Sequence, residues 1–310
     1  AASITDGLPY NPDLGPYETA ADGRSSGVRD DMWAFTSRNP GLDLSAATVF
    51  AAASRALKGY NDDLSERALR QSKRLLEEAT ALIADRPGDN RTWGGGPATP
   101  GATLELFIST GEEQYRDKFL ELLWPSLDRF VSFSLLTALD AIPYMDAAYR
   151  EKLRPYVIKY REYIEKLESD NPYGVPIGLG NWAGAGEVLN FGTTVCFASK
   201  YFPDIIEADH AFKTANWLFG CHPYHNYSFV AAVGAARPKA VFYGNNRADF
   251  SFIPGNVAPG VLFRKPDHFE NYDDWPFLWG QNEGTIAGNT SYLIFGSAFR
   301  DLMNLIKPGD

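Results

Sequence analysis

The chain has 310 residues, which is enough for one large domain or two ordinary ones. Its hydrophobic share of 45% and charged share of 22% are typical of a globular protein, and they argue against a disordered chain or a coiled coil. The formal net charge of -10 disfavours a nucleic acid or an anionic membrane as the partner.

Residues 1–40 are rich in Gly, Pro, Asp and Asn, so we expect an irregular N-terminal segment with turns. The segment begins with neither a methionine nor a basic-plus-apolar targeting signal, and we interpret it as continuing from an upstream part. No apolar run in the chain approaches the roughly 20 residues needed to cross a bilayer.

Residues 41–310 are expected to form one helical domain, because apolar residues recur at three- and four-residue spacing between short loops. Asp43 is expected to cap the first helix, Gly59 to end it, and Pro155 to break or kink a later one. The order of helices predicts an all-α toroid, and the lack of a fixed sequence period makes a regular solenoid the weaker choice. The predicted helices cover 42–60, 61–88, 101–111, 112–130, 144–168, 185–202, 207–220 and 284–306.

Three loops interrupt the helical pattern and carry Gly together with Trp. The first spans 86–101 and contains Trp93, the second spans 171–186 and contains Trp182, and the longest spans 221–284. Loops of such length inside a compact domain are usually functional. We therefore expect them to line one rim of the toroid for ligand binding.

Three segments resemble glycoside hydrolase family 9, the inverting cellulases and their relatives. They read NWAGAGEVLNFGTTVCFASKYF, WLFGCHPYHNYSFVAAVG and WGQNEGTIAGNTSYLIFGSAF, in that order along the chain. The resemblance covers most of the chain from about Asp30 onward. It implies an (α/α)6 barrel, here incomplete, with long irregular loops forming the active-site rim. It also implies that Glu283, in the Asn-Glu segment, is the general acid.

The chain departs from the family pattern in two places. The Asp-Ala-Gly-Asp motif that holds the nucleophilic water does not occur in residues 1–310, so the resemblance implies that an N-terminal segment or another chain supplies the paired aspartates, or that they are lost. The acidic pair Asp30-Asp31 has the wrong spacing for that motif. The sugar-binding loop reads FYGNNRADFSFIPG, so Arg247 is carried over as a substrate clamp, whereas the family's His contact is not.

Glu283 suits the acid's role on chemical grounds as well. Inverting hydrolysis needs a protonated carboxylic acid and a water-activating carboxylate roughly 6.5–9.5 Å apart. The preceding residues include Trp275 and Trp279, and an apolar wall raises the pKa of a carboxyl group. The competing interpretation is a Glu in a first helical turn, where the helix dipole would lower that pKa.

The other candidate site residues are aromatic or polar loop residues. An arginine beside amides and a carboxylate can bind ring hydroxyls, or it can form an Arg-Asp pair that only stabilises the loop. The tryptophans can stack on sugars, or they can pack in the core. The candidates for substrate binding are Tyr243, Asn245, Arg247, Asp249, Trp93, Trp182 and Trp279.

No metal site or cofactor is expected. His222 and His225 lie three residues apart but have no obvious third ligand, so a structural zinc ion is disfavoured. A structural calcium ion remains compatible with the Asp and Asn residues of the loops. Cys196 and Cys221 are too few for a disulfide framework, and we favour free buried thiols over a single bridge.

The leading hypothesis is a secreted or periplasmic hydrolase that cleaves β-linked glucans or oligosaccharides with inversion. One alternative is an exo-acting β-glucosidase or glucosaminidase of the same family. Another is a non-catalytic carbohydrate-binding relative that lacks the aspartate base. A polysaccharide lyase on an α/α toroid would need a Tyr or His base and contacts to uronates, for which Arg247 is thin support.

Overall fold

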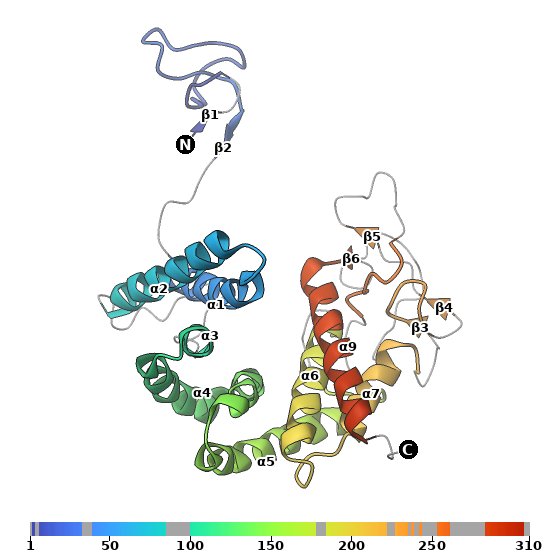
Figure 1. The fold of residues 1–310 in the computed structure, drawn as a ribbon. Helices are drawn as coiled ribbons and strands as arrows, with labels where there is room; N and C mark the ends of the chain where they lie inside the picture. The colour runs from blue at the N-terminus through green and yellow to red at the C-terminus, as the bar shows by residue number, and fades with distance from the viewer. Residues whose placement is uncertain are drawn as a thin grey trace.

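The structure is a computed structural model that describes residues 2–3, 6–32, 39–84, 100–177, 184–221, 227–234, 237–238, 242–243, 253–260 and 283–306. Within these ranges the long elements are all helices, and each strand has two residues. Figure 1 shows the helices arranged in an arc, with the N-terminal segment drawn apart from them.

The helices are α1 (Pro40–Leu57), α2 (Asp62–Ala84), α3 (Gly101–Thr110), α4 (Glu113–Asp140), α5 (Ala147–Ser169), α6 (Ala185–Tyr201), α7 (Asp209–Leu218) and α9 (Ile286–Ile306), with a short 3-10 helix at Ile142–Tyr144. The strands are β1 (Ala2–Ser3), β2 (Asp31–Met32), β3 (Tyr227–Ser228), β4 (Arg237–Pro238), β5 (Phe242–Tyr243) and β6 (Glu283–Gly284). β1 and β2 pair antiparallel, whereas β3–β4 and β5–β6 pair parallel.

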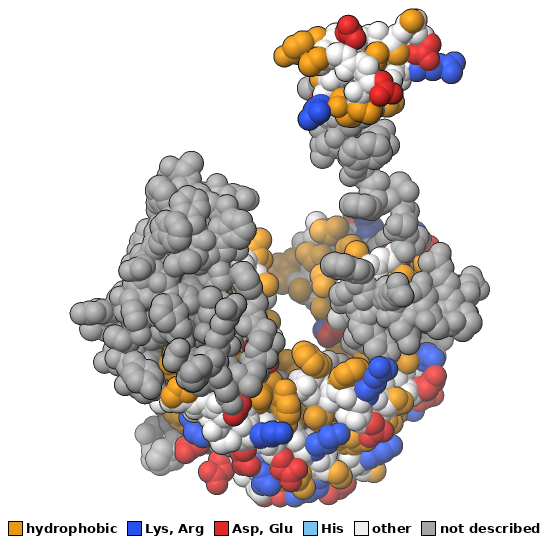
Figure 2. Space-filling view, turned by 180° about the vertical axis from the view of Figure 1, so that it is seen from behind, with side chains coloured by type: hydrophobic (Ala, Val, Ile, Leu, Met, Phe, Trp, Pro, Cys, Tyr) orange, Lys and Arg blue, Asp and Glu red, His pale blue; other side chains and the backbone are white. Residues whose placement is uncertain are grey.

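The helices form two layers, as expected for an α/α toroid. The helices α1, α3, α4, α6 and α9 pack successively against one another. The other three helices form the second layer and alternate with the first along the chain: α2 packs on α1 and α3, α5 on α4, and α7 on α6. The arc is open between α1 and α9 in Figure 1, and Figure 2 shows a hollow at its centre.

The α4 helix bends sharply at Phe130, whose φ of -143° and ψ of 64° are not helical. The prediction that a helix ends at residue 130 marks this corner correctly. The second arm, 131–140, was not predicted, although its buried residues Val131, Leu135 and Ala138 keep helical spacing. The hydroxyl groups of Ser126 and Ser134 lie 2.6 Å apart and join the two arms.

Two expectations about where helices begin and end differ from the structure, and one is confirmed. The N-cap of α1 is Asn39, not Asp43, because the Asn39 side chain accepts hydrogen bonds from the next helical N–H groups. Pro155 does not break a helix, since α5 is continuous and its buried residues pack into the core. Gly59 has a φ of +82° and lies just beyond α1, so the predicted stop is confirmed.

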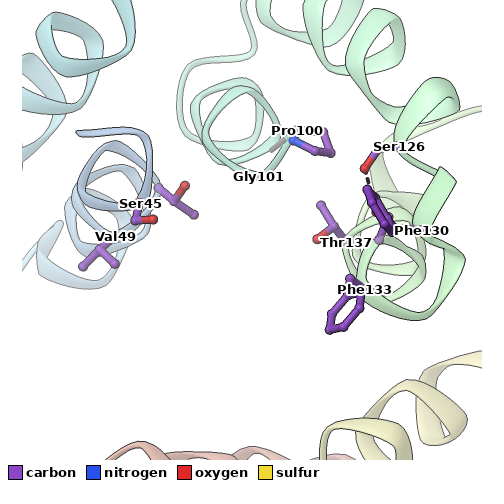
Figure 3. Close-up of a pocket in the computed structure, with 10 residues that line it drawn as sticks. Ser45, Val49, Pro100, Gly101, Ser126, Phe130, Phe133 and Thr137 are labelled. Carbon is purple, nitrogen blue, oxygen red and sulfur yellow. Dashed lines mark hydrogen bonds between the residues drawn. The ribbon is translucent and has the colours of Figure 1, made fainter. Parts of the chain in front are cut away.

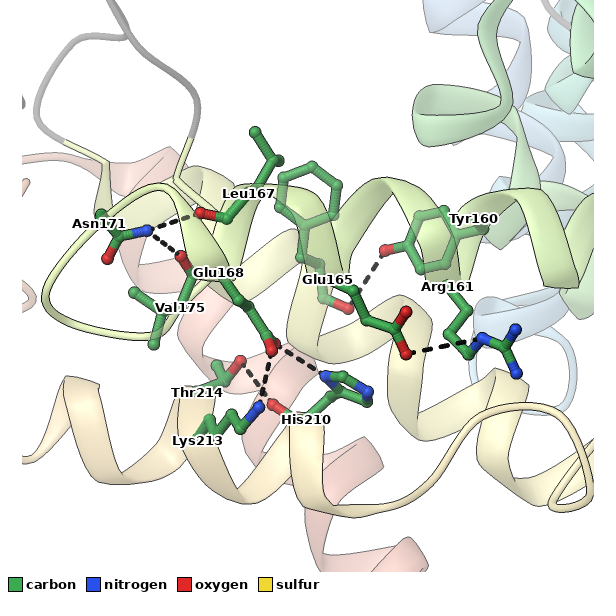
Figure 4. A network of polar contacts seen from close by, with 11 residues as sticks. Tyr160, Arg161, Glu165, Leu167, Glu168, Asn171, Val175, His210, Lys213 and Thr214 are labelled. Atoms are coloured by element: carbon green, nitrogen blue, oxygen red, sulfur yellow. Dashed lines mark hydrogen bonds and ion pairs between the residues drawn. The ribbon is translucent and has the colours of Figure 1, made fainter.

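Close packing and one buried polar cluster hold the C-terminal helices together. At Gly192 of α6, an added Cβ would lie 2.6 Å from Thr214 of α7 and 2.8 Å from Phe295 of α9. The Glu168 carboxylate of α5 is 7% exposed. It lies 2.8 Å from Nδ1 of His210 and 2.7 Å from Nζ of Lys213, as Figure 4 shows. The cluster therefore anchors α5 on α7.

The two cysteines do not form a disulfide. Cys196 is buried in α6 and Cys221 is exposed, so the expectation of free thiols is confirmed and that of burial holds for Cys196 alone. Among the described helices, none combines the length and apolar character needed to traverse a bilayer.

Candidate active site

The inner helices begin at one common rim. The α1 and α3 helices are parallel, because Thr48 lies beside Gly101 while Arg55, farther along, contacts Glu105. In the same way, α6 runs antiparallel to α5: Tyr160 donates to the Phe191 carbonyl, and Arg150 donates to that of Tyr201.

The second arm of α4 also runs antiparallel to α5 and therefore parallel to α6. Tyr149, near the start of α5, donates to the Ala138 carbonyl near the end of α4. Farther along α5, Lys159 donates to the Asp128 carbonyl close to the α4 corner. The corner therefore lies at the same end of the toroid as the start of α6.

Glu283 lies on this rim. Its strand, β6, pairs in parallel with β5, placing Phe242 opposite Glu283 and Tyr243 opposite Gly284. The α9 helix begins immediately afterwards at Ile286. The structure therefore brings the backbones of two predicted site residues, Tyr243 and Glu283, side by side at the start of an inner helix.

Two asparagines that the sequence analysis did not select fix the backbone behind Glu283. Asn289 of α9 accepts a hydrogen bond from the Val257 N–H and donates one from Nδ2 to the Asn256 Oδ1, both at 2.8 Å. Asn256 is 2% exposed and its amide lies against Gly284, where an added Cβ would be 2.2 Å from Nδ2. Asn-Gly contacts of this kind leave no pattern in the sequence, because the two segments are far apart in the chain.

The segment 253–260 also reaches α6. The Pro259 carbonyl accepts a hydrogen bond from the Ala185 N–H at 2.7 Å, and Gly260 bridges to Gly184. A cavity of about 260 Å³ lies at this junction. Its polar lining includes Asn190, Thr285 and Ser291. This cavity adjoins the start of α9 and can accept groups that hydrogen-bond to an amide or a hydroxyl.

A larger cavity of about 620 Å³ lies on the same rim, across the central hollow. It is bounded by the second and third turns of α1, by the start of α3, and by the corner and second arm of α4 (Figure 3). Both cavities adjoin the loops that were expected to line the ligand-binding rim.

Most predicted substrate-binding residues lie outside the described residues. These are Asn245, Arg247, Asp249, Trp93, Trp182 and Trp279. His222 and His225, which were disfavoured as zinc ligands, also lie outside the described residues. The acidic pair is partly described: an Asp30 oxygen accepts a hydrogen bond from the Asp6 N–H, and Asp31 pairs with Ser3 in the N-terminal segment. These contacts account for Asp30 and Asp31 within that segment.

One carboxyl group with a large pKa shift lies elsewhere. Desolvation, and to a lesser extent the Glu105 carboxylate, raise the pKa of Asp140 to about 6. Asp140 is the last residue of α4, at the end of the inner helix opposite the rim of Glu283. It is therefore too far along the barrel to act with Glu283. Across the described ranges, no three His, Cys, Asp or Glu residues gather as a metal site would require.

Comparison with known proteins identifies one matching family. The sequence profile described as Glycosyl hydrolase family 9 matches residues 19–295. No curated protein sequence matches the chain.

Solved structures with the same architecture include a metagenome-derived glycoside hydrolase family 9 endoglucanase, at 20% identity and a TM-score of 0.62, matched over 83% of this chain and 51% of that one. An endoglucanase from the termite Nasutitermes takasagoensis has 17% identity and a TM-score of 0.65, with 89% and 70% coverage. The catalytic domain of Clostridium thermocellum CelT has 13% identity and a TM-score of 0.62, with 88% and 64% coverage.

These likenesses establish the fold. The expected all-α architecture is confirmed, and the described helices form part of an (α/α)6 barrel. The chain spans about half the length of the metagenome-derived structure that it matches.

Proposed function

This chain belongs to glycosyl hydrolase family 9, and from that membership we propose that it carries one half of the catalytic machinery of an inverting β-glucan hydrolase, with Glu283 as the general acid. The observation that carries this proposal is the position of Glu283. Its backbone lies at the rim where the inner helices begin, beside β5 and next to a cavity that has three hydrogen-bonding side chains in its lining. A carboxyl group in such a place can reach a glycosidic oxygen bound over the rim.

The substrate class rests on the relatives and on the chemistry of the rim. The solved structures of similar fold are endoglucanases. In this chain the cavity beside α9 is lined mainly by small apolar residues, and Asn190, Thr285 and Ser291 add an amide and two hydroxyl groups that can hydrogen-bond to a neutral sugar. We propose β-linked glucans or their oligosaccharides as substrate, with Tyr243, Asn245, Arg247, Asp249, Trp93, Trp182 and Trp279 as binding residues, in a secreted or periplasmic enzyme.

The water-activating carboxylate is proposed to come from polypeptide outside residues 1–310. Two features support this. The arc formed by the described helices is open between α1 and α9 (Figure 1). The open edge of α9 exposes apolar side chains, including Ile286 (75% exposed) and Leu293 (68% exposed). Helices that covered this edge would close the barrel and could bring paired aspartates to the rim.

The test uses a polypeptide extended to include such an aspartate pair. We expect Glu283→Gln to lower kcat on soluble β-linked gluco-oligosaccharides by about 10²–10⁴-fold, because the leaving oxygen loses its proton donor. Binding of the oligosaccharide should persist. The matched control is Glu151→Gln, which changes an exposed glutamate near the start of α5, at the end of the barrel opposite the rim, and should leave kcat within about twofold of the wild type.

Two outcomes would contradict the proposal. Unchanged release of reducing sugar in Glu283→Gln would remove its role as acid. Complete inactivity of the extended wild type, with oligosaccharide binding intact, would instead favour a carbohydrate-binding relative. The stereochemistry is checked separately by NMR of the first product, which should be the α-anomer for inversion at a β-linkage.

A further inference from the structure

We propose that the helical hairpin of α1 and α2, residues 40–84, is a detachable wall of the barrel. It separates from α3 and unfolds as one cooperative unit while α4 to α9 stay folded. The motion follows from the way in which the described helices are joined, and it is independent of the proposed catalysis. Its effect is to open and close the rim on the side of the larger cavity.

The buried apolar side chains of the described helices fall into two separate clusters. The larger cluster contains buried residues from α4 to α9 and reaches α3 through Leu104. The smaller cluster consists of Leu44, Ala47, Leu75, Ala79 and Ala102, which belong to α1, α2 and the start of α3. The two clusters meet at α3, so the hairpin has a small core that is separate from the core of the later helices.

Within the hairpin, the two helices are tied together by buried hydrogen bonds. Ser65 of α2 donates to the Ser54 carbonyl of α1, and Ser72 of α2 donates to the Ala47 carbonyl of α1, both at 2.6 Å. All four residues are buried. Separating α1 from α2 would leave these carbonyls and hydroxyl groups without their partners, which is costly. The two helices are therefore expected to leave the barrel together.

The joint between the hairpin and the next helices relies on ion pairs that water can reach. Arg55 of α1 lies 2.5 Å from the Glu105 carboxylate and donates to the Ser109 hydroxyl at 2.8 Å, both on α3. Lys73 of α2 lies 2.6 Å from the carboxylate of Glu112, just before α4. The four charged side chains are between 22% and 38% exposed. Such pairs stabilise a joint less than buried contacts do.

The rim end of the hairpin does not pack on α4. Ser45, Thr48 and Val49 of α1 face Phe130 and Thr137 of α4 across a cavity of about 620 Å³ (Figure 3). The hairpin can therefore leave α3 without breaking a packed interface with α4 at this place, and the cavity then loses its α1 wall. The ion pairs and hydrogen bonds of the joint all lie between described helices, so they are present whatever covers the open edge of α1.

The experiment is hydrogen exchange of the 310-residue chain, followed by mass spectrometry at increasing urea concentrations. Amides of α2 should exchange through an opening of lower free energy and weaker urea dependence than those of α6, because less surface is exposed. Arg55→Gln should raise the exchange rate in α2 by roughly 5- to 30-fold and leave α6 unchanged. The matched control is Arg154→Gln, which breaks the pair with Asp204 at similar arginine exposure and should leave exchange in α2 unchanged.

A covalent lock tests the same motion in the opposite direction and remains informative if Arg55→Gln fails to fold. A Cβ added at Gly101 would lie 3.6 Å from the side chain of Thr48, so Thr48→Cys with Gly101→Cys suits a disulfide between α1 and α3. Cys221→Ser removes the exposed thiol from this background. Oxidation should slow exchange in α2 by at least about 10-fold, and a reductant should restore it.

Three results would overturn the proposal. One is an equal opening free energy and urea dependence for α2 and α6 in the wild type. Another is an acceleration by Arg55→Gln that is absent from α2 or equal in α2 and α6. The third is an oxidised lock that leaves exchange in α2 unchanged or slows α2 and α6 alike. Any of these would mean that the hairpin unfolds only together with the rest of the barrel.

Discussion

The contact between Asn256 and Gly284 shows how a single residue fixes the candidate acid. Asn256 is held by Asn289, whose own orientation is set by the backbone N–H of Val257. This leaves the Asn256 amide flat against Gly284, with no room for a side chain. The residue after Glu283 therefore has to be glycine for β6 to lie where it does.

Gly284→Ala tests this contact. The added Cβ would overlap the Asn256 amide, so we expect the free energy of unfolding to fall by about 1–3 kcal/mol. Asn256→Ala removes the obstacle, and the double variant should be more stable than the sum of the two single changes predicts. Urea unfolding of the four proteins measures the coupling.

The matched control is Gly186→Ala, in the first turn of α6. A Cβ added to Gly186 would have open space around it, with no described atom within 4 Å beyond its own helix backbone and chain neighbours. This change should be neutral or stabilising by up to about 1 kcal/mol. Additive effects of Gly284→Ala and Asn256→Ala would contradict the proposed overlap.

At the scale of elements, α5 and α7 are joined by the cluster of Glu168, His210 and Lys213 (Figure 4). Glu168→Ala removes a buried carboxylate and leaves His210 without its partner. Lys213 is 46% exposed and can turn to solvent. We therefore expect a loss of about 1–3 kcal/mol, below the value for a fully buried pair.

The comparison variant is Glu78→Ala, which breaks the solvent-accessible pair with Arg74 on α2. That change should cost at most about 0.5 kcal/mol. Thermal unfolding of both variants checks the difference. Similar losses in the two proteins would mean that Glu168 adds nothing beyond a surface ion pair.

Elements were predictable where the apolar period was long and uninterrupted. The periodicity identified α1, α2, α5 and α9 because their buried faces repeat at helical spacing. It missed the second arm of α4, although the buried residues of that arm keep helical spacing, because the expected helix stopped at the corner. The prediction that Pro155 breaks a helix was wrong, because packing of the apolar face of α5 outweighs the missing backbone hydrogen bond.

The candidate site was predictable only in part, for a different reason. Glu283 lies in a contiguous motif that can be read from the sequence alone. Asn256 and Asn289 belong to the rim because distant segments meet there, and no local pattern encodes such a meeting. The roles of Arg247 and the loop tryptophans stay predictions, since these residues lie outside the described ranges.

At the scale of the whole molecule, the open arc leaves an apolar edge on α9. Leu293 and Ile294 are 68% and 51% exposed on neighbouring positions of that helix. An apolar surface of this kind tends to associate in water. We expect the 310-residue chain to self-associate as its concentration rises, and Leu293→Glu to weaken that association.

Sedimentation velocity over a range of concentrations measures the effect. Tyr60→Glu provides the control, because Tyr60 is exposed at the far end of α1 and away from the α9 edge. A monomer at every concentration, or equal effects of the two substitutions, would contradict this prediction.

The common rim has an electrostatic consequence for any carboxylate that completes the site. Each helix that begins there contributes a partial positive charge of about half an elementary charge at its N-terminus. The convergent ends of α1, α3, α6 and α9 thus create a locally positive field in a molecule whose net charge is -10. Such a field stabilises an ionised water-activating carboxylate. The same field lowers the pKa of a proton-donating carboxyl group at this rim, so that group must owe its proton affinity to an apolar or anionic neighbour strong enough to outweigh the helix ends.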